Sequence, residues 1–392
     1  MKVGEMNEKG MKEEEVLVIL NEKKRKDRRY DRILSSMCTY PHDIALKAHM
    51  MFIEANLGDS GLFPGTSEME EEVVRMTGAL LGEENACGYI STGGTESNIQ
   101  AVRAFRNFKM REWRGTPREG ERMNIVVPES AHFSFEKIAD MLCIDVRKAQ
   151  LDDELRVDLS DVEALIDDKT IGLVGIAGTT EFGQIDPIKE MGDIAIRNEI
   201  FLHVDAAFGG FVIPFLDKKY EFDFSVEGVS TISVDPHKML ASTIPAGCVL
   251  FRENELMEML SVETPYLTTK TQFSLTGTRS GAAAAATYAV MKFLGVEGMR
   301  RIVRKCMDIT KMLVYGARSL GVHTVIEPVM NVVALDVGDA ERVSSALRER
   351  GGWITSVTRK PKALRLVIMP HVKEETVSDF LADLKCVCEE QC

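Results

Sequence analysis

The chain has 392 residues, 45% of them hydrophobic and 28% charged, and a formal net charge of -13. A chain of this length can bury a large core, so we expect two domains, or one large domain and one small. The negative charge argues against nucleic acid as the main partner. No stretch approaches the ~18 unbroken apolar residues of a membrane helix, so no membrane span is expected.

The eight cysteines are scattered, apart from Cys386, Cys388 and Cys392 near the end of the chain. No histidine lies near these three and their spacing is unlike the usual zinc patterns, so we expect no metal site. The apolar run at residues 16–20 is short and flanked by charges, which argues against a secretory leader. The thiols are therefore expected to be mostly free, in a cytoplasmic protein.

Residues 1–62 are predicted to form a helical N-terminal segment ahead of the main fold. They contain six basic residues between positions 23 and 29, a pattern typical of a solvated helix face. The next helix is expected to begin at Ser67, because Ser67 can cap it and Glu70 follows at the spacing of a capping box.

From residue 86 onward, strand and helix patterns alternate. Apolar strands of about five residues separated by helices are typical of a largely parallel α/β sheet that is covered on both faces. The predicted strands span residues 86–91, 124–128, 171–177, 200–205, 231–234 and 248–251. The predicted helices run from the Gly93-Gly94 turn to residue 110 and over residues 134–141, 159–166 and 187–197.

An alanine-rich helix is predicted at residues 281–295, and we assign residues 63–295 to one large domain. Beyond this point the order changes to helix, strand, helix, strand, helix. That order predicts a small α+β domain over residues 296–392. Its expected strands span residues 330–336 and 363–369, and its later helices span residues 342–350 and 374–389.

Polar residues follow several of the predicted strands. Asp205 ends an apolar strand and precedes the small residues Ala206 and Ala207, and Lys238 closes the tetrapeptide Asp-Pro-His-Lys 33 residues later. Ligands of open parallel sheets bind beyond the carboxyl ends of the strands, so we expect these side chains to share one site.

This arrangement predicts a site for pyridoxal 5'-phosphate (PLP). That cofactor needs an amine, an acid for its pyridine nitrogen and a cradle for its phosphate. Lys238 is the candidate amine for the Schiff base, and burial is expected to lower its pKa. Asp205 is the candidate acid that keeps the ring nitrogen protonated. Taken alone, Lys238 is more simply a solvated lysine, and Asp205 can equally be a helix or turn cap.

Three further loops offer contacts to such a cofactor. The turn at Gly93 and Gly94 lies between a strand and a helix, where backbone N–H groups and the helix dipole attract a phosphate. His132 can lie over the ring and touch the substrate carboxylate, and Thr180 can donate to the ring's phenolic oxygen. Taken alone, the turn can be a simple N-cap and His132 a hydrogen-bonded loop histidine. Their shared position at strand ends favours one site.

The motifs at residues 91–98, 203–207 and 235–238 resemble those of the group II PLP-dependent amino acid decarboxylases, which include glutamate and aromatic amino acid decarboxylases. The similarity runs from about Phe63 to Leu366 and is greatest to the archaeal L-tyrosine/L-aspartate decarboxylase branch. The resemblance implies an α/β fold of PLP fold type I, which is aspartate-aminotransferase-like, with a large, mainly parallel seven-stranded sheet domain. It also implies an obligate homodimer with active sites at the subunit interface.

The resemblance assigns most of the candidate residues to the cofactor. The implied contacts are Lys238 as the Schiff base, His237 beside it, Asp205 on the pyridine nitrogen, Ala207 under the ring, Thr180 at the ring oxygen, His132 over the ring face, and Gly94 and Thr95 on the phosphate.

Four residues outside these contacts also enter through the resemblance. Tyr266 matches a mobile-loop tyrosine that returns a proton to the product, and Arg365 matches an arginine that binds the substrate carboxylate. Thr278 is placed to reach the phosphate of the partner subunit. Asp235, where many relatives carry asparagine, is left without a role.

The implied reaction is the decarboxylation of an L-amino acid. L-Tyrosine would give tyramine for methanofuran synthesis, and L-aspartate would give β-alanine for coenzyme A. Aspartate needs a second cationic contact, for which Arg279 is a candidate.

Three alternatives stay open. One is a PLP-dependent carbon–carbon lyase of the sphingosine-phosphate-lyase type. Another is a cysteine desulfurase, although no cysteine lies in an evident mobile loop. The third is a non-catalytic nucleotide-binding module, which would be colourless.

Overall fold

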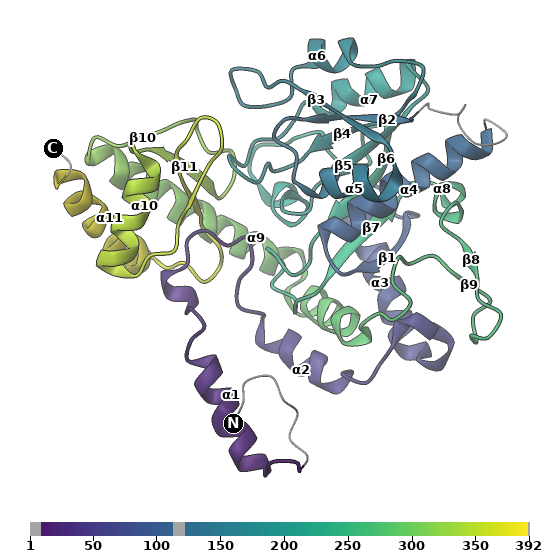
Figure 1. Ribbon diagram of the computed structural model, residues 1–392, viewed down its shortest axis with the longest axis horizontal. Helices are drawn as coiled ribbons and strands as arrows, with labels where there is room; N and C mark the ends of the chain where they lie inside the picture. Colours follow the sequence, from purple (N-terminus) through teal and green to yellow (C-terminus); the bar gives the residue numbers. More distant parts are fainter. Residues whose placement is uncertain (1–8, 113–121, 391–392) are drawn as a thin grey trace.

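The computed structural model describes residues 9–112 and 122–390, so Cys392 of the C-terminal cysteine group lies outside the described residues. Within these ranges the chain forms a seven-stranded sheet, a four-stranded sheet and a two-stranded hairpin (Figure 1). None of the helices in these ranges is long and apolar enough to cross a membrane.

The described helices pack mainly around the two larger sheets. They are α1 (Glu13–Lys24), α2 (Asp43–Met51), α3 (Pro64–Leu80), α4 (Gly94–Glu112), α5 (Ser134–Leu142), α6 (Leu159–Ala164), α7 (Ile188–Arg197), α8 (Asn254–Glu258), α9 (Gly281–Ser319), α10 (Ala340–Gly351) and α11 (Glu374–Glu389).

The seven-stranded sheet has the order β1-β7-β6-β5-β4-β2-β3. Neighbouring strands from β6 to β3 pair in parallel, whereas β7 runs antiparallel to both β6 and β1. The sheet is therefore mainly parallel, as predicted. Its strands are β1 (Cys87–Ser91), β2 (Asn124–Pro128), β3 (Asp145–Ala149), β4 (Thr170–Ile176), β5 (Phe201–Asp205), β6 (Val229–Val234) and β7 (Gly247–Phe251).

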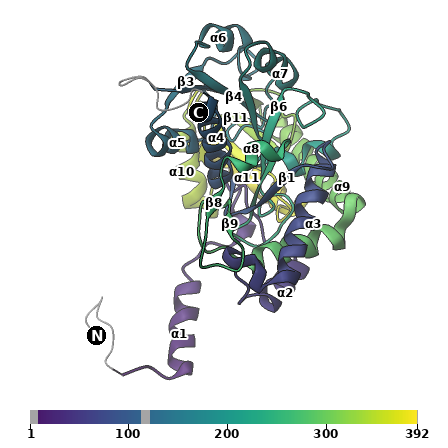
Figure 2. The same cartoon turned by 90° about the vertical axis from the view of Figure 1, so that its right-hand side faces the viewer.

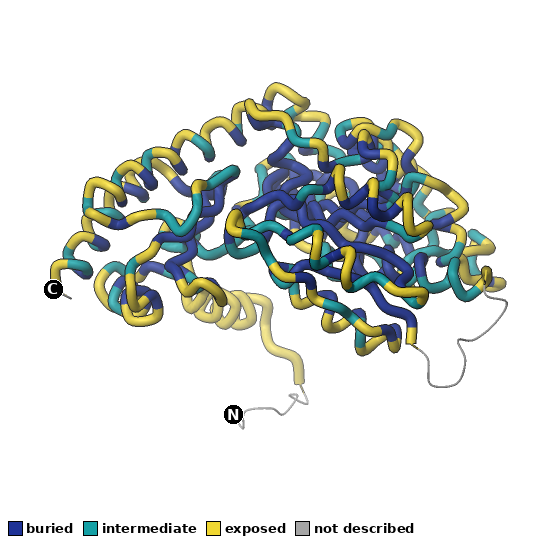
Figure 3. Tube along the Cα trace, turned by 90° about the horizontal axis from the view of Figure 1, so that it is seen from above, coloured by how far each residue is buried: buried dark blue, intermediate teal, exposed yellow. Residues whose placement is uncertain are grey.

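The sheet is covered on both faces, and its core accounts for most of the deeply buried side chains of the larger unit (Figure 3). Every residue of β2, β4 and β7 is buried, which explains their nearly continuous apolar sequences. Helix α4 packs against this core through Phe105, whose ring stacks on Phe201 of β5 with centroids 4.7 Å apart. Because Phe201 is the first residue of β5, this contact joins the second half of α4 to the amino end of the strand.

A four-stranded antiparallel sheet forms a smaller unit, which α10, α11 and the second half of α9 cover. Its core contains Trp353 and Phe380, whose rings meet edge to face at 5.3 Å. The strands of this sheet are β10 (His323–Thr324), β11 (Val332–Asp336), β12 (Ser356–Val357) and β13 (Leu364–Val367).

Helix α9 joins the two units and crosses the predicted domain boundary at residues 295 and 296. The helix is interrupted at this boundary, because Gly295 has a positive φ of 55° that only glycine adopts easily. Gly295 thus forms a kink between two helical stretches of α9.

Two segments, helix α1 and a β-hairpin, are less enclosed than the rest of the molecule. Helix α1 stands away from the body of the molecule and has no buried residue (Figure 2). The hairpin of β8 (Val262–Glu263) and β9 (Thr271–Gln272) also extends outward. Helix α2, in contrast, packs along α9.

Two local predictions were wrong. Helix α3 begins at Pro64, whose fixed φ suits a first helical turn, so Ser67 is not its cap. Glu70 is buried and accepts a hydrogen bond from the Ile90 N–H at 2.9 Å, instead of closing a capping box. Strand β3 was not predicted, because its sequence DVRKA is mostly charged or polar, as is common for a strand at a sheet edge.

Candidate active site

A cavity of about 300 Å³ opens where β4, β5 and β6 end side by side and α4 begins. The carboxyl ends of these parallel strands meet at one edge of the sheet, so the polar residues that follow them converge. The predicted site residues that line the cavity are Gly94, Thr95, His132, Thr180, Asp205, Ala207, His237 and Lys238.

Asp205 lies at the end of β5 and is 7% exposed. Its Oδ2 accepts a hydrogen bond from Asn98 Nδ2 at 2.8 Å, and its Oδ1 accepts from the Ala207 N–H at 3.1 Å and from Ser233 Oγ at 3.3 Å. All three donors are neutral, so they stabilise a carboxylate without cancelling its charge. Asp205 is thus a fixed negative charge at the cavity wall.

Asn98 is itself held by the buried residue His203. The Asn98 side chain donates through Nδ2 to Asp205, so its Oδ1 accepts from His203 Nε2 at 2.9 Å. The other ring nitrogen of His203 therefore accepts from Thr231 Oγ1 at 2.8 Å. Burial lowers the pKa of His203 to about 4, which keeps the ring neutral in this chain of hydrogen bonds.

Lys238 follows β6, and its Nζ lies 3.0 Å from Oδ2 of Asp235. Burial lowers the pKa of Lys238, but the carboxylates of Asp235 and Asp205 outweigh this effect and raise it overall. The prediction that the pKa of Lys238 is lowered is therefore wrong for the protein without a bound ligand. That prediction rested on burial alone, whereas a paired carboxylate favours the charged amine.

The turn between β1 and α4 has the geometry of an anion cradle. Gly93 has a positive φ of 146°, and a Cβ on Gly94 would stand 3.1 Å from both the Ala207 Cβ and Asp235 Oδ2. Side chains are thus kept out, and the first-turn N–H groups of α4 lie at the cavity, where they favour an anion. The Glu96 carboxylate holds the turn by accepting from the Thr92 N–H at 2.8 Å. These features fit the phosphate of PLP.

His132 and Thr180 enter the cavity from the loops after β2 and β4. His132 Nδ1 accepts from the Ser134 N–H at 3.2 Å, and its ring lies against Phe133 with centroids 3.9 Å apart. Burial lowers the pKa of His132, so the imidazole is neutral near neutral pH. A neutral, flat ring of this kind can stack on a second aromatic ring.

Arg365, on β13 of the smaller unit, lies directly behind Thr180. Its Nε donates to the Thr180 carbonyl oxygen at 2.5 Å, and its Nη1 donates to the Ser35 carbonyl oxygen at 2.9 Å and to Ser356 Oγ at 3.1 Å. Arg365 is 7% exposed, and among the described residues no carboxylate forms an ion pair with it. Burial lowers its pKa to about 10. Arg365 is therefore a buried cation that no described carboxylate contacts directly, although the Glu181 carboxylate acts on it from a distance. Arg365 does not line the cavity itself but lies behind Thr180, which does.

The structure does not bring Tyr266 or Thr278 to the cavity of their own chain. Tyr266 is 85% exposed in the loop between β8 and β9, and Thr278 is exposed just before α9. Neither residue is among those that line the cavity.

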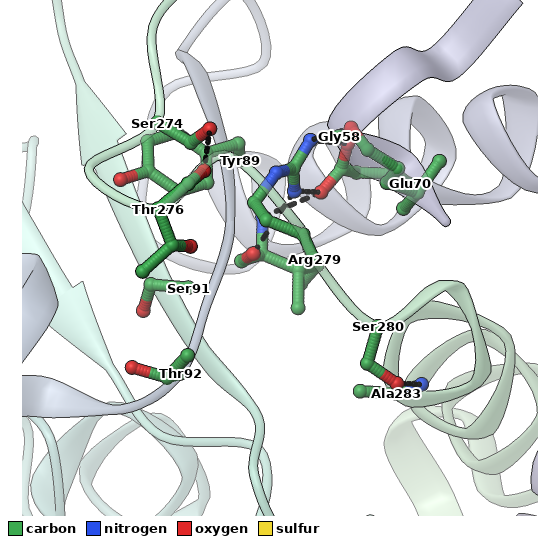
Figure 4. A network of polar contacts seen from close by, with 12 residues as sticks. Gly58, Glu70, Tyr89, Ser91, Thr92, Ser274, Thr276, Arg279, Ser280 and Ala283 are labelled. Carbon is green, nitrogen blue, oxygen red and sulfur yellow. Dashed lines mark hydrogen bonds and ion pairs between the residues drawn. The ribbon is translucent and has the colours of Figure 1, made fainter. Parts of the chain in front are cut away.

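Arg279 is also unsuited to the role of a second cationic contact for aspartate. Its guanidinium is buried and paired with both carboxylate oxygens of Glu70, the Nη2–Oε2 distance being 3.0 Å (Figure 4). It also donates to the carbonyl oxygens of Ile90 and Leu57. Arg279 thus joins α3, β1 and the segment before α9, and its charge is already neutralised.

Several residues that line the cavity were given no individual role from the sequence, among them Met37, Asn98 and Ser130. Asn98 follows Gly94 by four residues on α4, and residues at this spacing lie on the same face of a helix. Helical periodicity could therefore have placed Asn98 at the cavity. Ser130 lies in the loop that carries His132, and its Oγ is buried without a hydrogen-bond partner in the described structure. Met37 comes from the N-terminal segment, and no local pattern connects it to the sheet.

The fold and the cavity together define a PLP-binding protein of fold type I. Among solved structures, the chain resembles a sphingosine-1-phosphate lyase from Burkholderia pseudomallei (TM-score 0.89, 29% identity, covering 99% of this chain and 93% of that one). It also resembles a glutamate decarboxylase from Lactobacillus brevis (TM-score 0.90, 22% identity, covering 100% and 95%). The second likeness shows the fold alone.

The family model of the pyridoxal-dependent decarboxylase conserved domain matches residues 32–336. A probable L-tyrosine/L-aspartate decarboxylase from Methanothrix thermoacetophila is 60% identical, with 97% of each chain covered. A probable L-aspartate decarboxylase from Archaeoglobus fulgidus is 52% identical, covering 92% of this chain and 96% of the relative. The chain belongs to the pyridoxal-dependent decarboxylase family. It is a PLP-dependent amino acid decarboxylase of the archaeal branch.

Proposed function

We propose that this decarboxylase acts on L-tyrosine, L-aspartate or both, and forms tyramine or β-alanine. The proposal is supported by the high identity to archaeal relatives named for these two substrates. The single observation in the structure that carries it is Arg365, a buried cation behind Thr180 that no described carboxylate contacts directly. An amino acid carboxylate would supply the missing charge. Tyramine would enter methanofuran synthesis, and β-alanine would enter coenzyme A synthesis.

The geometry of the larger unit supports the cofactor-binding roles that we propose. Lys238 would bind the cofactor aldehyde, Asp205 would hold a proton on the pyridine nitrogen, and the turn at Gly94 and Thr95 would bind the phosphate. When bound, PLP supplies an electron sink for the pair that decarboxylation leaves at Cα. The fixed charge of Asp205 is the main contribution of the protein to that sink, because it is in place before the reaction begins.

The remaining contacts would orient the ring and the substrate. Ala207, Thr180 and His237 lie around the cavity where they would touch the ring, its oxygen and the phosphate end. His132 would cover the other ring face. Together with Arg365, it would hold the Cα–carboxylate bond out of the ring plane, so that the bond that breaks is aligned with the electron sink.

We further propose that the active enzyme is a homodimer with active sites at the subunit interface. Several apolar side chains of the N-terminal segment are exposed, among them Met50 at 66% and Met51 at 70%, and exposed apolar patches of this kind mark contact surfaces. Tyr266 would then protonate Cα in the active site of the partner subunit, and Thr278 would reach its phosphate. This accounts for their distance from the cavity of their own chain.

Two further assignments belong to the same proposal. The domain limits would be residues 1–62, 63–295 and 296–392, with Gly295 as the hinge within α9. A cytoplasmic location is supported by the free thiols of all described cysteines.

A second candidate reaction is the carbon–carbon cleavage of the sphingosine-phosphate-lyase type, which the 29% identity to such a lyase favours. Both reactions use the same lysine, aspartate and phosphate cradle. They differ in the bond that is aligned with the electron sink, and hence in the product, which is carbon dioxide in one case and an aldehyde in the other.

The test is steady-state kinetics on tyrosine, aspartate and glutamate side by side, with carbon dioxide and the amine product measured. We expect turnover of tyrosine, aspartate or both, and none in the Lys238→Ala variant. Turnover of glutamate alone would contradict the proposed substrates. Release of an aldehyde without carbon dioxide would favour the lyase.

A further inference from the structure

Asp235 is a buried carboxylate that lines the cavity, and none of the roles proposed above involves it. It follows the last residue of β6, and its N–H donates to the Ala207 carbonyl oxygen at 3.0 Å. Its own carbonyl oxygen accepts from the Lys238 N–H at 3.0 Å, which closes a turn between the two residues. This turn places Oδ2 of Asp235 3.0 Å from the Lys238 amine.

The two oxygens of Asp235 are in different environments. Oδ2 faces Lys238, whereas Oδ1 is buried and has no hydrogen-bond partner in the described part of the chain. The side chain as a whole is only 3% exposed. A buried carboxylate oxygen without a donor lacks the hydrogen bonds that it would make in water. Among the described residues, the Lys238 amine is therefore the charged group that Asp235 contacts most closely.

No other described group can take the proton of Lys238 as directly. The other titratable side chains that face the amine are Asp205, Cys38, His132 and His237. His237 Nδ1 donates to the Ala246 carbonyl oxygen at 2.5 Å, and its Nε2 lies 3.9 Å from Asp235 Oδ2. Among the described residues, only Asp235 forms a hydrogen-bonded ion pair with Lys238.

The anion cradle at Gly93 and Gly94 also lies next to Asp235. A Cβ on Gly94 would stand 3.1 Å from Asp235 Oδ2, so an anion bound at this turn would lie close to the carboxylate. The two negative charges would repel each other. Moving the proton of Lys238 onto Asp235 removes this repulsion and frees the amine at the same time.

We propose that Asp235 is the base that takes the proton of the Lys238 ammonium when the amine adds to a carbonyl group, and that returns it when the amine is released. The proton moves from Nζ to Oδ2, and the freed electron pair of Nζ bonds to the carbonyl carbon. The condensation then releases one water molecule. This inference rests on the role of Lys238 proposed above.

The proposal predicts an unusual dependence of the lysine on pH. In the pair, one proton is shared between Nζ and Oδ2, so the fraction of free amine that forms by transfer to Asp235 does not change with pH. Free amine that forms by loss of the proton to solvent adds to this fraction and rises about tenfold per pH unit, so the transfer is most visible at the low end of the pH range. An isolated lysine instead loses its proton to solvent, and its free-amine fraction rises about tenfold per pH unit below its pKa. The Asp235→Asn variant removes the internal base and should behave in this second way.

The experiment uses the full-length chain after removal of the cofactor. Propanal and cyanoborohydride are added between about pH 6 and pH 9, below the usual lysine pKa. Labelling of Lys238 and of Lys189, which is exposed on α7, is then measured by peptide mass spectrometry. The ratio of the two cancels the pH dependence of the reducing step.

For the unmodified chain, we expect the ratio of Lys238 to Lys189 labelling to fall as the pH rises, by up to about tenfold per pH unit at the low end of the range. In the Asp235→Asn variant the ratio should be constant, and in Asp235→Glu it should fall again. A constant ratio in the unmodified chain would overturn the proposal, and this result needs no variant to fold.

A second measurement separates this inference from the proposed function. Borohydride reduction of the PLP-loaded chain should attach the cofactor to Lys238. Attachment to another lysine would overturn the proposed function itself. Attachment to Lys238 together with a constant labelling ratio would overturn only the role of Asp235.

Discussion

The larger unit lines the cavity, Arg365 of the smaller unit lies behind it, and the charged groups of the two units differ in their partners. In the larger unit, the charged groups at the strand ends already have partners: Asp205 accepts from neutral donors, and Lys238 is paired with Asp235. In the smaller unit, Arg365 is buried beside Thr180 with carbonyl and hydroxyl partners only. Asp205 and Lys238 at the cavity thus have close partners, whereas no described carboxylate contacts Arg365 directly.

This difference suggests a division of labour. A preformed set of hydrogen bonds can hold one rigid group in one orientation, which suits a resident cofactor. A buried cation that no carboxylate contacts directly favours a carboxylate that binds and dissociates, which suits a substrate. The comparison predicts that changes in the larger unit alter cofactor binding or turnover, whereas a change at Arg365 mainly alters substrate binding.

The largest effect is expected for Asp205→Asn. The shape of the side chain is kept but the fixed negative charge is lost, so kcat should fall by about 10²–10³-fold, as when one preorganised electrostatic contact is removed. The measurement is steady-state kinetics on the cofactor-saturated enzyme, with Asp205→Glu as the variant that keeps the charge. A kcat within a factor of about two of the unmodified enzyme would mean that the charge of Asp205 is not used.

Arg365→Gln should lower kcat/KM by roughly 30–100-fold, because an amino acid carboxylate would lose its charged partner. The dissociation constant of PLP should change little. Arg359→Gln is the matched control, since Arg359 comes from the same unit and binds Glu181 next to Thr180, but is largely exposed. If Arg365→Gln weakened PLP binding as much as it weakened substrate use, the proposed division would be wrong.

Asn98→Ala should weaken PLP binding by about 10-fold. The substitution removes the hydrogen bond that Asn98 donates to Asp205 and the acceptor of the His203 Nε2–H group. A buried polar group without a hydrogen-bond partner lowers the stability of the site by about 1–3 kcal/mol. Titration of the apoenzyme with PLP, followed by absorbance, measures the change. Asn107→Ala, which removes a hydrogen bond to the Met259 carbonyl oxygen elsewhere on α4, should leave PLP binding unchanged.

The last prediction concerns the stability of the larger unit and not its binding or turnover. The pKa of His203 is lowered by burial to about 4, against 6.5 for an exposed histidine. The unfolded chain therefore takes up a proton below about pH 6.5 that the folded chain refuses, and stability is lost as the pH falls from there toward about 4. Between about pH 7 and pH 5, the free energy of unfolding should drop on the order of 2 kcal/mol from this source.

Urea unfolding of the apoenzyme at both pH values measures this loss. The loss should be smaller in His203→Gln, whose side chain does not titrate. Equal losses in the two proteins would show that His203 is not kept neutral by the fold.

The sequence predicted those parts of the site that depend on local order. Asp205 and Lys238 each follow a short apolar run, and parallel strands bring such residues together whatever the details of packing. The contacts that support them were not predictable in the same way. The links from Asn98 to His203 and from Glu70 to Arg279 join residues far apart in the chain, and only the packed structure brings them together.

Two errors had local causes that the sequence did contain. The pKa of Lys238 was judged from burial alone, although Asp235 lies three residues earlier, at a spacing that a turn can close. The start of α3 was placed at Ser67, although Pro64 is a good first helical residue. Strand β3 is different, since its charged sequence becomes a strand only because β2 offers it a parallel edge.

The most direct test of the account is a crystal structure of the enzyme reconstituted with PLP. We expect the cofactor to be bonded to Lys238 Nζ, with its pyridine nitrogen within hydrogen-bond distance of Asp205 and its phosphate at the turn of Gly93 and Gly94. A cofactor bonded to Lys238 but with its ring nitrogen away from Asp205, or bound elsewhere on the chain, would contradict the account.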